Sequence, residues 1–176
     1  MIRAVCLLIL LIPSISYSQT DLVLAKSFRS QNVINSQTLF IENESILPPE
    51  EGEPTYSITI TVTDIRNKEG VIRFKFYDDT TPFPHDQGFL RIVVQKSEVI
   101  NNSFTATYYG FTAKQMGIAL QDDENSNRVL DLGWFFPKEG HAFSDYHHTA
   151  LRRPVYSDFR FLLEGDKQVI MKMKYY

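Results

Sequence analysis

The sequence predicts an all-β protein, an antiparallel β-sandwich of about seven strands with one long loop between the fifth and sixth strands. From residue 56 onward, apolar and polar residues alternate in short runs, which is the period of a half-buried strand. Turn-forming residues separate these runs, and no stretch keeps a helical period. Aromatic residues make up 13% of the chain, and this enrichment favours strands because flat rings pack well on a pleated surface.

The first 18 residues are interpreted as a secretory signal peptide. Arg3 precedes an apolar run over residues 4–12, and small polar residues follow Pro13. This order matches the charged, apolar and cleavage regions of such a peptide, although a buried N-terminal strand is the alternative. The run is too short to span a bilayer. We therefore expect an exported protein, periplasmic or extracellular, with no membrane span after signal cleavage.

Residues 19–55 are predicted to form a polar N-terminal extension that ends in a linker rich in proline and glutamate. Pro48, Pro49 and Pro54 interrupt regular structure near its end. One short strand over residues 38–42 is compatible with the pattern. The β-sandwich domain is predicted over residues 56–176, because strict alternation begins there.

The expected strands of this domain each present one apolar face. They cover residues 57–63, 72–77, 90–94, 104–108, 116–120, 159–163 and 169–173. In the first, Ile58, Ile60 and Val62 share a face, and hydroxyl side chains occupy the other. In the second, Phe74 and Phe76 are predicted to face inward.

Arg73 and Lys75 alternate with those phenylalanines and are predicted to face outward. The pair Asn101-Asn102 predicts a hairpin turn, and residues 164–166 predict the turn of a final hairpin. Two antiparallel sheets packed face to face, as in immunoglobulin-like or transthyretin-like domains, would bury the apolar face of every strand.

The long loop, residues 122–157, carries the most unusual chemistry. Oxygen-bearing side chains recur at Asp123, Asn125, Asn127 and Asp131, and the spacing adds the backbone carbonyl of Val129. This is the front half of a calcium-binding loop, since calcium takes six to eight oxygen ligands. The sequence therefore makes this loop a candidate calcium site.

Two positions weaken the calcium pattern. Arg128 stands where such loops have glycine, and Trp134 stands where they have the closing glutamate. Calcium would therefore bind weakly. The alternative is an Asx-rich turn, in which the same side chains accept hydrogen bonds from the backbone.

A second cluster lies further along the loop. His141, His147 and His148 stand close in sequence to Glu139 and Asp145. These are residue types that bind zinc, but their spacing matches no helical zinc motif. A metal-dependent hydrolase using His141, His147 and His148 is the alternative functional hypothesis, and solvated loop histidines are the simpler interpretation.

Ser144 follows His141 closely and is a candidate nucleophile, although no G-x-S-x-G motif surrounds it. The aromatic residues of the loop are candidates for a ligand or partner surface, formed by Trp134, Phe135 and Phe143 together with His141. The alternative is that these aromatics plug the open end of the sandwich.

Three segments resemble a known family. Residues 121–131, QDDENSNRVLD, are similar to the H-D-E-N-G-N-G-K-L-D run of the bacterial domain-of-unknown-function family 2141. Residues 136–144, FPKEGHAFS, are similar to its G-I-P-x-E-G-x-G-F-S-N run, and residues 154–159, PVYSDF, to its P-P-S-F-x-D-A stretch. The resemblance covers residues 56–176 and implies a small, exported, β-rich protein with no assigned activity. Ser126 and Arg128 replace both glycines of the first run.

The functional prediction is a non-enzymatic binding or interaction module with a degenerate calcium-type loop. Its partner would be an envelope protein or a small ligand. The net charge of −3 argues against a broad nucleic-acid footprint. The sequence contains no complete catalytic set, so no catalytic residue and no cofactor other than weakly bound calcium is expected.

Overall fold

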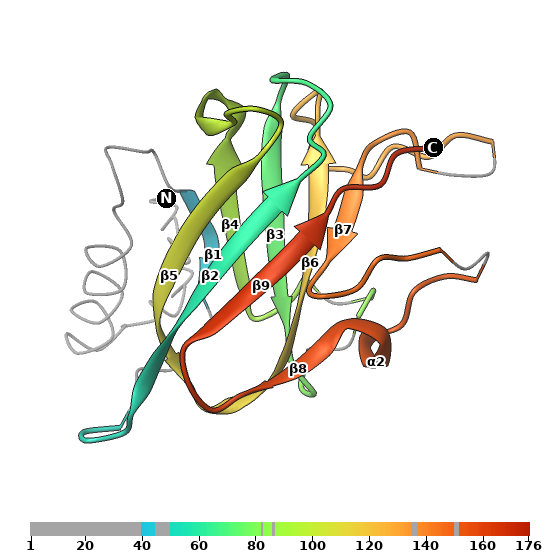
Figure 1. Cartoon of the computed structure of the whole chain (residues 1–176). Helices are drawn as coiled ribbons and strands as arrows, with labels where there is room; N and C mark the ends of the chain where they lie inside the picture. Colours follow the sequence, from blue (N-terminus) through green and yellow to red (C-terminus); the bar gives the residue numbers. More distant parts are fainter. Residues whose placement is uncertain (1–39, 45–49, 82, 86, 135–136, 150–151) are drawn as a thin grey trace, which may run out of the picture.

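The chain forms a β-sandwich, which confirms the predicted fold class (Figure 1). The computed structural model describes residues 40–44, 50–81, 83–85, 87–134, 137–149 and 152–176. The predicted signal peptide lies outside these residues, and so does most of the predicted extension. No helix in the described ranges is long and apolar enough to cross a membrane.

The larger sheet forms one layer of the sandwich. Its strands run in the order β1 (Phe40–Glu44), β4 (Leu90–Gln95), β3 (Val71–Tyr77), β6 (Lys114–Asp123) and β7 (His141–Phe143). A further strand, β8 (Arg160–Leu163), pairs with the beginning of β6. Strand β1 lies within the predicted extension, so this extension contributes the edge strand beside β4.

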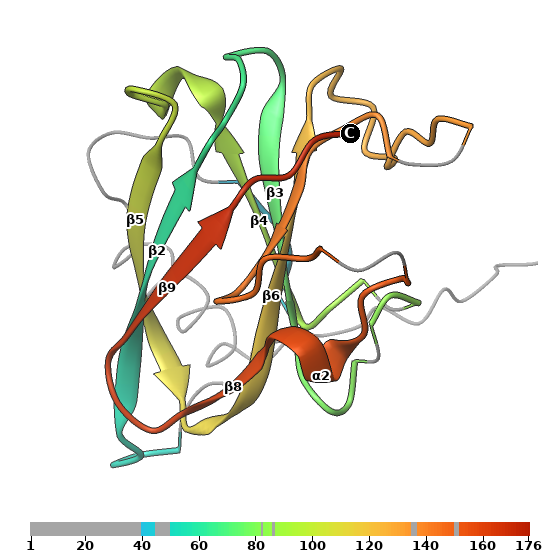
Figure 2. The same cartoon turned by 45° about the vertical axis from the view of Figure 1, so that its right-hand side comes forward.

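The smaller sheet has the order β5 (Phe104–Thr112), β2 (Thr55–Thr63) and β9 (Lys167–Lys172). Its strands cross those of the larger sheet obliquely (Figure 2). Strands β2 and β5 are antiparallel, whereas β2 and β9 are parallel. The sandwich is therefore antiparallel except at this one pair of its smaller sheet.

The two predicted hairpins are tight turns that pass between the sheets. Asn101 and Asn102 adopt left-handed φ values of 50° and 61°, but they lead from β4 in one sheet to β5 in the other. Gly165 likewise lies between β8 and β9, which belong to different sheets. The final hairpin was therefore predicted wrongly, because a turn fixes a local reversal and not the strand that each arm pairs with.

The core fills the space between the two sheets. Ile58, Ile60 and Val62 of β2 face Phe74 and Phe76 of β3, and all five are buried. The predicted inward faces of these two strands are confirmed. Packing of opposed apolar faces is the main favourable term for a sandwich of this kind.

A second, smaller cluster covers part of the outer face of the larger sheet. It consists of Tyr77, Phe143 and Phe159, with partly buried Phe83, Tyr146 and Tyr156 against them. Strand β7 and a short helix, α2 (Tyr156–Phe159), supply three of these six rings. The segment predicted as one loop therefore folds back onto the sheet, and its aromatic residues cover one end of it.

A buried polar network joins the two sheets near the C-terminal end of β6. Lys96, in a short helix η1 (Lys96–Glu98), places Nζ 2.6 Å from Oδ1 of Asp122 at the end of β6. The Tyr175 hydroxyl donates to Oδ2 of Asp122 at 2.6 Å, and Lys96 also donates to Asn67 at 2.8 Å. Burial raises the pKa of Asp122, and the ammonium group of Lys96 opposes that shift.

Candidate functional site

The loop after β6 is wound around the carboxylate of Asp123. This carboxylate is fully buried, and its Oδ2 accepts from Nε of Arg73 at 2.5 Å and from the backbone N–H of Arg128 at 3.0 Å. Its Oδ1 accepts from the backbone N–H of Asn127 at 3.0 Å. One carboxylate therefore holds the loop against β3.

The other predicted calcium ligands also accept hydrogen bonds. Oδ1 of Asn125 accepts from the N–H of Asn127 at 3.0 Å, and Oδ1 of Asn127 accepts from the N–H of Val129 at 2.8 Å. The carboxylate of Asp131 accepts from the side-chain amide of Asn125 at 2.6 Å. The carbonyl of Val129 accepts from the side chain of Gln121 at 2.9 Å. These contacts are those of successive Asx turns, the alternative to calcium.

The calcium hypothesis stays a prediction, and a thermal melt tests it. Because the ligand oxygens already accept N–H donors, melts in millimolar calcium and in excess chelator are expected to agree within about 1 °C. A site with a dissociation constant of about 10⁻⁴–10⁻³ M would behave differently. At about tenfold excess of calcium it would add about 1.4 kcal/mol and raise the midpoint by about 4 °C.

Ser126 and Arg128 adopt left-handed backbone conformations, with φ values of 57° and 69°. These are the two positions at which the family run has glycine, the residue that adopts this region without steric penalty. A side chain here costs about 1–2 kcal/mol. Arg128 therefore adopts the left-handed backbone conformation that glycine favours, and it carries a guanidinium group at this position.

The histidines of the hydrolase hypothesis have separate partners. The ring of His141 stacks on Tyr176, and burial lowers its pKa to about 4. His148 is buried, with Nδ1 3.0 Å from the Tyr146 hydroxyl and Nε2 2.8 Å from the carbonyl of Arg152. His141 is therefore neutral at neutral pH, and both ring nitrogens of His148 are engaged in hydrogen bonds.

The remaining members of that cluster also lie apart. His147 is exposed, and Asp145 forms an ion pair with Lys167 at 3.0 Å. Glu139 is buried and accepts from the side chain of Gln121 at 2.8 Å, and burial raises its pKa. Across the residues that the structure describes, no group of three His, Cys, Asp or Glu side chains could hold a metal ion.

Ser144, the candidate nucleophile, is a buried structural residue. Its hydroxyl donates to the carbonyl of Phe159 at 2.7 Å and accepts from the N–H of Ile118 at 2.9 Å. These bonds tie β7 to β6 and to α2. The hydroxyl therefore faces backbone groups of the interior.

The predicted aromatic surface is not one surface. Phe143 is buried in the outer aromatic cluster, as the plug alternative expects, and His141 is half-buried. Trp134 is 97% exposed, beside exposed Leu132 on the loop. Phe135 lies outside the described residues. Of the predicted surface, the structure therefore leaves Trp134 fully open to solvent.

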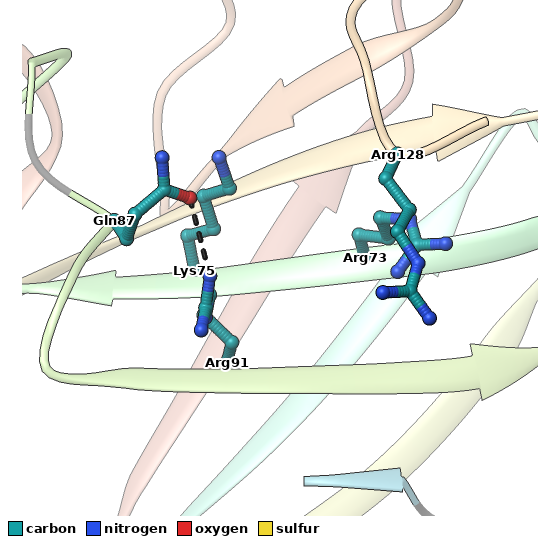
Figure 3. Close-up of a pocket in the computed structure, with 5 residues that line it drawn as sticks. All are labelled: Arg73, Lys75, Gln87, Arg91 and Arg128. Carbon is teal, nitrogen blue, oxygen red and sulfur yellow. Dashed lines mark hydrogen bonds between the residues drawn. The ribbon is translucent and has the colours of Figure 1, made fainter. Parts of the chain in front are cut away.

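A basic pocket lies on the outer face of the larger sheet (Figure 3). Its volume is about 360 Å³, and its lining residues are Arg73 and Lys75 of β3, Arg91 of β4, Gln87 before β4, and Arg128. Arg128 belongs to the loop over residues 123–131, which we call the Asx loop. Four of the five are cationic and none is acidic, although the whole chain carries a net charge of −3. The wall of this pocket is therefore formed by four cationic side chains and one amide.

The contacts of Arg91 leave one hydrogen-bond donor in the basic pocket without an acceptor among the described residues. Arg91 and Lys75 stand directly opposite each other in the β3–β4 ladder. Arg91 donates from Nη1 to Gln87 at 3.3 Å, but its Nε is buried without an acceptor among the described residues. A buried donor without a partner is unfavourable, and an anion bound beside Arg91 would supply the missing acceptor.

The sequence contained part of the signal for this pocket. Arg73 and Lys75 were predicted to face outward, and Arg91 occupies the equivalent outward position between Leu90 and Ile92. Arg128 was considered only as a departure from the glycine of calcium-binding loops. The pairing of β3 with β4, which the sequence does not state, is what places these cations together.

A family model described as "Uncharacterized protein conserved in bacteria (DUF2141)" matches residues 60–171. The chain therefore belongs to this family, which confirms the resemblance seen in the sequence. No curated protein and no solved structure matches the chain. The family description names no activity, so the chemistry has to be argued from the site.

Proposed function

We propose that this member of the family is an exported, non-enzymatic binding module of the bacterial envelope that binds an anionic ligand in the basic pocket. The observation that carries the proposal is the pocket itself, about 360 Å³ with four cationic side chains in its wall. Arginine and lysine form short, charge-assisted hydrogen bonds with carboxylate, phosphate and sulfate groups. An anion is therefore the complementary ligand.

The pocket stands on a rigid base. Arg73, Lys75 and Arg91 come from paired strands, and the buried Asp123 fixes the side chain of Arg73. Sites built on strands hold their geometry better than sites built on loops.

Two further observations support the proposal, one for a non-enzymatic role and one for export to the envelope. The candidate nucleophile Ser144 and the candidate ligand His148 are both buried and hydrogen-bonded. Export is supported by the sequence alone, through Arg3 and the apolar run over residues 4–12. An envelope location would give the pocket access to solutes and to anionic groups of envelope components.

Thermal melts with a small oxyanion test the proposal. At about tenfold excess over its dissociation constant, sulfate is expected to add about 1.4 kcal/mol and raise the wild-type midpoint by about 4 °C relative to chloride at equal ionic strength. Arg91→Met should melt close to wild type in chloride, because it also removes the buried Nε that has no acceptor among the described residues. It should also lose the sulfate-dependent rise.

Lys172→Met is the matched control, because Lys172 is exposed on β9 in the other sheet. Sulfate also stabilises proteins without binding, and this control measures that general effect. The proposal fails if Arg91→Met and Lys172→Met respond equally to sulfate.

A further inference from the structure

The buried polar network brings an amine and a carboxyl group into contact in the interior. Nζ of Lys96 is 2.6 Å from Oδ1 of Asp122, and both side chains are 0% exposed. Oδ1 has no aligned hydrogen-bond donor among the described residues, so this contact is a close approach without the orientation of a hydrogen bond. The carboxyl carbon is one bond of about 1.2 Å from Oδ1, so Nζ lies within about 3.8 Å of that carbon.

Two neighbours hold these groups in place. Oδ1 of Asn67 accepts from Nζ of Lys96 at 2.8 Å, and the Tyr175 hydroxyl donates to Oδ2 of Asp122 at 2.6 Å. Asn67 is fixed in turn by Glu124, whose Oε1 accepts from its side-chain amide at 2.7 Å. The amine and the carboxyl group therefore each have a hydrogen bond that fixes their position.

We propose that Lys96 and Asp122 become joined by an amide bond between Nζ and Cγ, an intramolecular cross-link that forms once the chain has folded. A proton passes from the ammonium group to the carboxylate, and the resulting amine attacks Cγ. The new C–N bond forms and the bond from Cγ to Oδ1 breaks. Oδ1 leaves as water, with one proton from the acid and one from the nitrogen, so the reaction needs no other reactant.

The interior favours the uncharged pair from which this reaction starts. Burial raises the pKa of Asp122, although the ammonium group of Lys96 opposes that shift. Charges are costly in a site without water, and a desolvated amine is an effective nucleophile. Well-oriented groups react at effective concentrations of about 10⁵–10⁸ M, which exceed the concentration of water. The fixed geometry therefore favours condensation over hydrolysis.

The surrounding hydrogen bonds also fit the amide product. Oδ2 of Asp122 carries negative charge while the C–N bond forms and then becomes the amide oxygen, and the Tyr175 hydroxyl already donates to it. A donor aimed at the oxygen on which charge develops accelerates acyl transfer. The amide nitrogen keeps one N–H, for which Oδ1 of Asn67 is the acceptor. Tyr175 is therefore the catalytic residue of this reaction, and Asn67 holds the nitrogen.

The bond would fix two strands that are not neighbours. Lys96 follows β4 directly and Asp122 lies near the end of β6, while β3 runs between these strands in the larger sheet. The only cysteine of the chain is Cys6, so no disulfide within the chain serves this purpose. The cross-link would therefore hold β4 and β6 at a fixed separation across β3.

The mass of the wild-type chain is the direct test. Intact-mass spectrometry of the purified full chain is expected to give the mass of its residues less one water molecule. Proteolysis followed by tandem mass spectrometry should then find a branched peptide that joins Lys96 to Asp122. Lys96→Met and Asp122→Leu should each keep the full mass of their own residues, because each lacks one reacting group.

Exposed lysine–aspartate pairs in the same chain are the matched controls. Lys167 and Asp145 are 3.0 Å apart, and Lys172 and Asp64 are 3.5 Å apart, with all four side chains at least 29% exposed. Peptides containing these pairs should remain unlinked, because proximity in water leaves both groups charged and hydrated.

The rate of cross-linking tests the role of Tyr175. Full chain made by cell-free synthesis would be sampled over time for intact mass, with circular dichroism to measure the folded fraction. Tyr175→Phe is expected to lose water about 10²-fold more slowly than wild type, because it lacks the donor to Oδ2. A wild-type rate in the folded fraction of this variant would show that Tyr175 has only a structural role.

The decisive result comes from the wild-type chain, so it does not depend on whether any variant folds. Folded wild type that keeps its full mass would overturn the proposal. A loss of water that persists in Lys96→Met, or that maps to a residue other than Asp122, would overturn it as well. Neither Lys96 nor Asp122 lines the basic pocket, so these outcomes leave anion binding unaffected.

Discussion

Replacing Lys96 by methionine is expected to lower the free energy of unfolding by about 3–5 kcal/mol. Lys96 Nζ and Asp122 Oδ1 are 2.6 Å apart, and both side chains are 0% exposed. The substitution leaves the Asp122 carboxylate buried without its counter-charge, with only the Tyr175 hydroxyl still donating to it. Urea unfolding at neutral pH measures the loss.

A double variant provides the control for this prediction. Lys96→Met combined with Asp122→Leu should be more stable than Lys96→Met alone, because an apolar pair carries no uncompensated charge. The deficit of the single variant should also shrink as the pH falls. The pKa of Asp122 is already raised by burial, and a carboxyl whose folded-state pKa is raised gains stability on protonation. Wild-type stability in Lys96→Met would contradict the expected role of the pair.

The strands could be predicted because their signal is local. In β2, the alternation of Ile58, Ile60 and Val62 identifies the buried face without knowledge of any partner. The pairing of β9 with β2, far apart in sequence, has no such local signal. The residues between β8 and β9 predict a turn correctly, but the same residues suit a hairpin and a passage between sheets equally well.

Burial of charged residues was harder to predict. Lys96 and Asp122 are types that are mostly exposed unless they are paired, and 26 positions separate them in the sequence. Arg73 was predicted to point outward, and it does leave the outer face of β3. It is nevertheless buried, because the Asx loop folds over it and Asp123 binds it.

The sequence drew attention to the loop after β6, and the structure shows what its side chains contact. The Asp123 to Asp131 segment was identified as unusual, and it does shape the site. Its oxygen atoms, however, accept backbone and side-chain hydrogen bonds, and its contribution to the basic pocket is Arg128. Side-chain types are the same in a calcium loop and in an Asx-rich turn, so the residues alone leave both open.

The outer face of the larger sheet explains why a pocket exists at all. Along β3, Tyr77 lies under the aromatic cluster with Phe143 and Phe159, while Lys75 and Arg73 follow on the same face beyond that cluster. The chain after β7 covers the first part of this face, and the Asx loop borders the second. The basic pocket is the area between these two covers.

Phe74→Ala is expected to lower the free energy of unfolding by about 3–5 kcal/mol, since it leaves a large cavity in the core. Phe74 is 0% exposed and lies between Ile92 and Leu120 on the neighbouring strands. Its ring packs edge-to-face against the ring of Tyr108, with the two ring centroids 6.3 Å apart. A domain of this kind has only about 5–15 kcal/mol in total. Urea unfolding is therefore expected to show a much lower midpoint with a similar slope.

Two comparisons isolate the packing effect in this experiment. Phe74→Leu keeps most of the volume and is expected to cost about 1 kcal/mol. Leu162→Ala truncates a side chain that is 57% exposed on β8, and it is expected to change stability by less than about 0.5 kcal/mol. If β3 points Phe74 into the sandwich, the loss of stability increases in the order Leu162→Ala, Phe74→Leu, Phe74→Ala. Equal unfolding of Phe74→Ala and Leu162→Ala would place Phe74 on the outer face, and Arg73 and Lys75 would then face the core instead of the pocket.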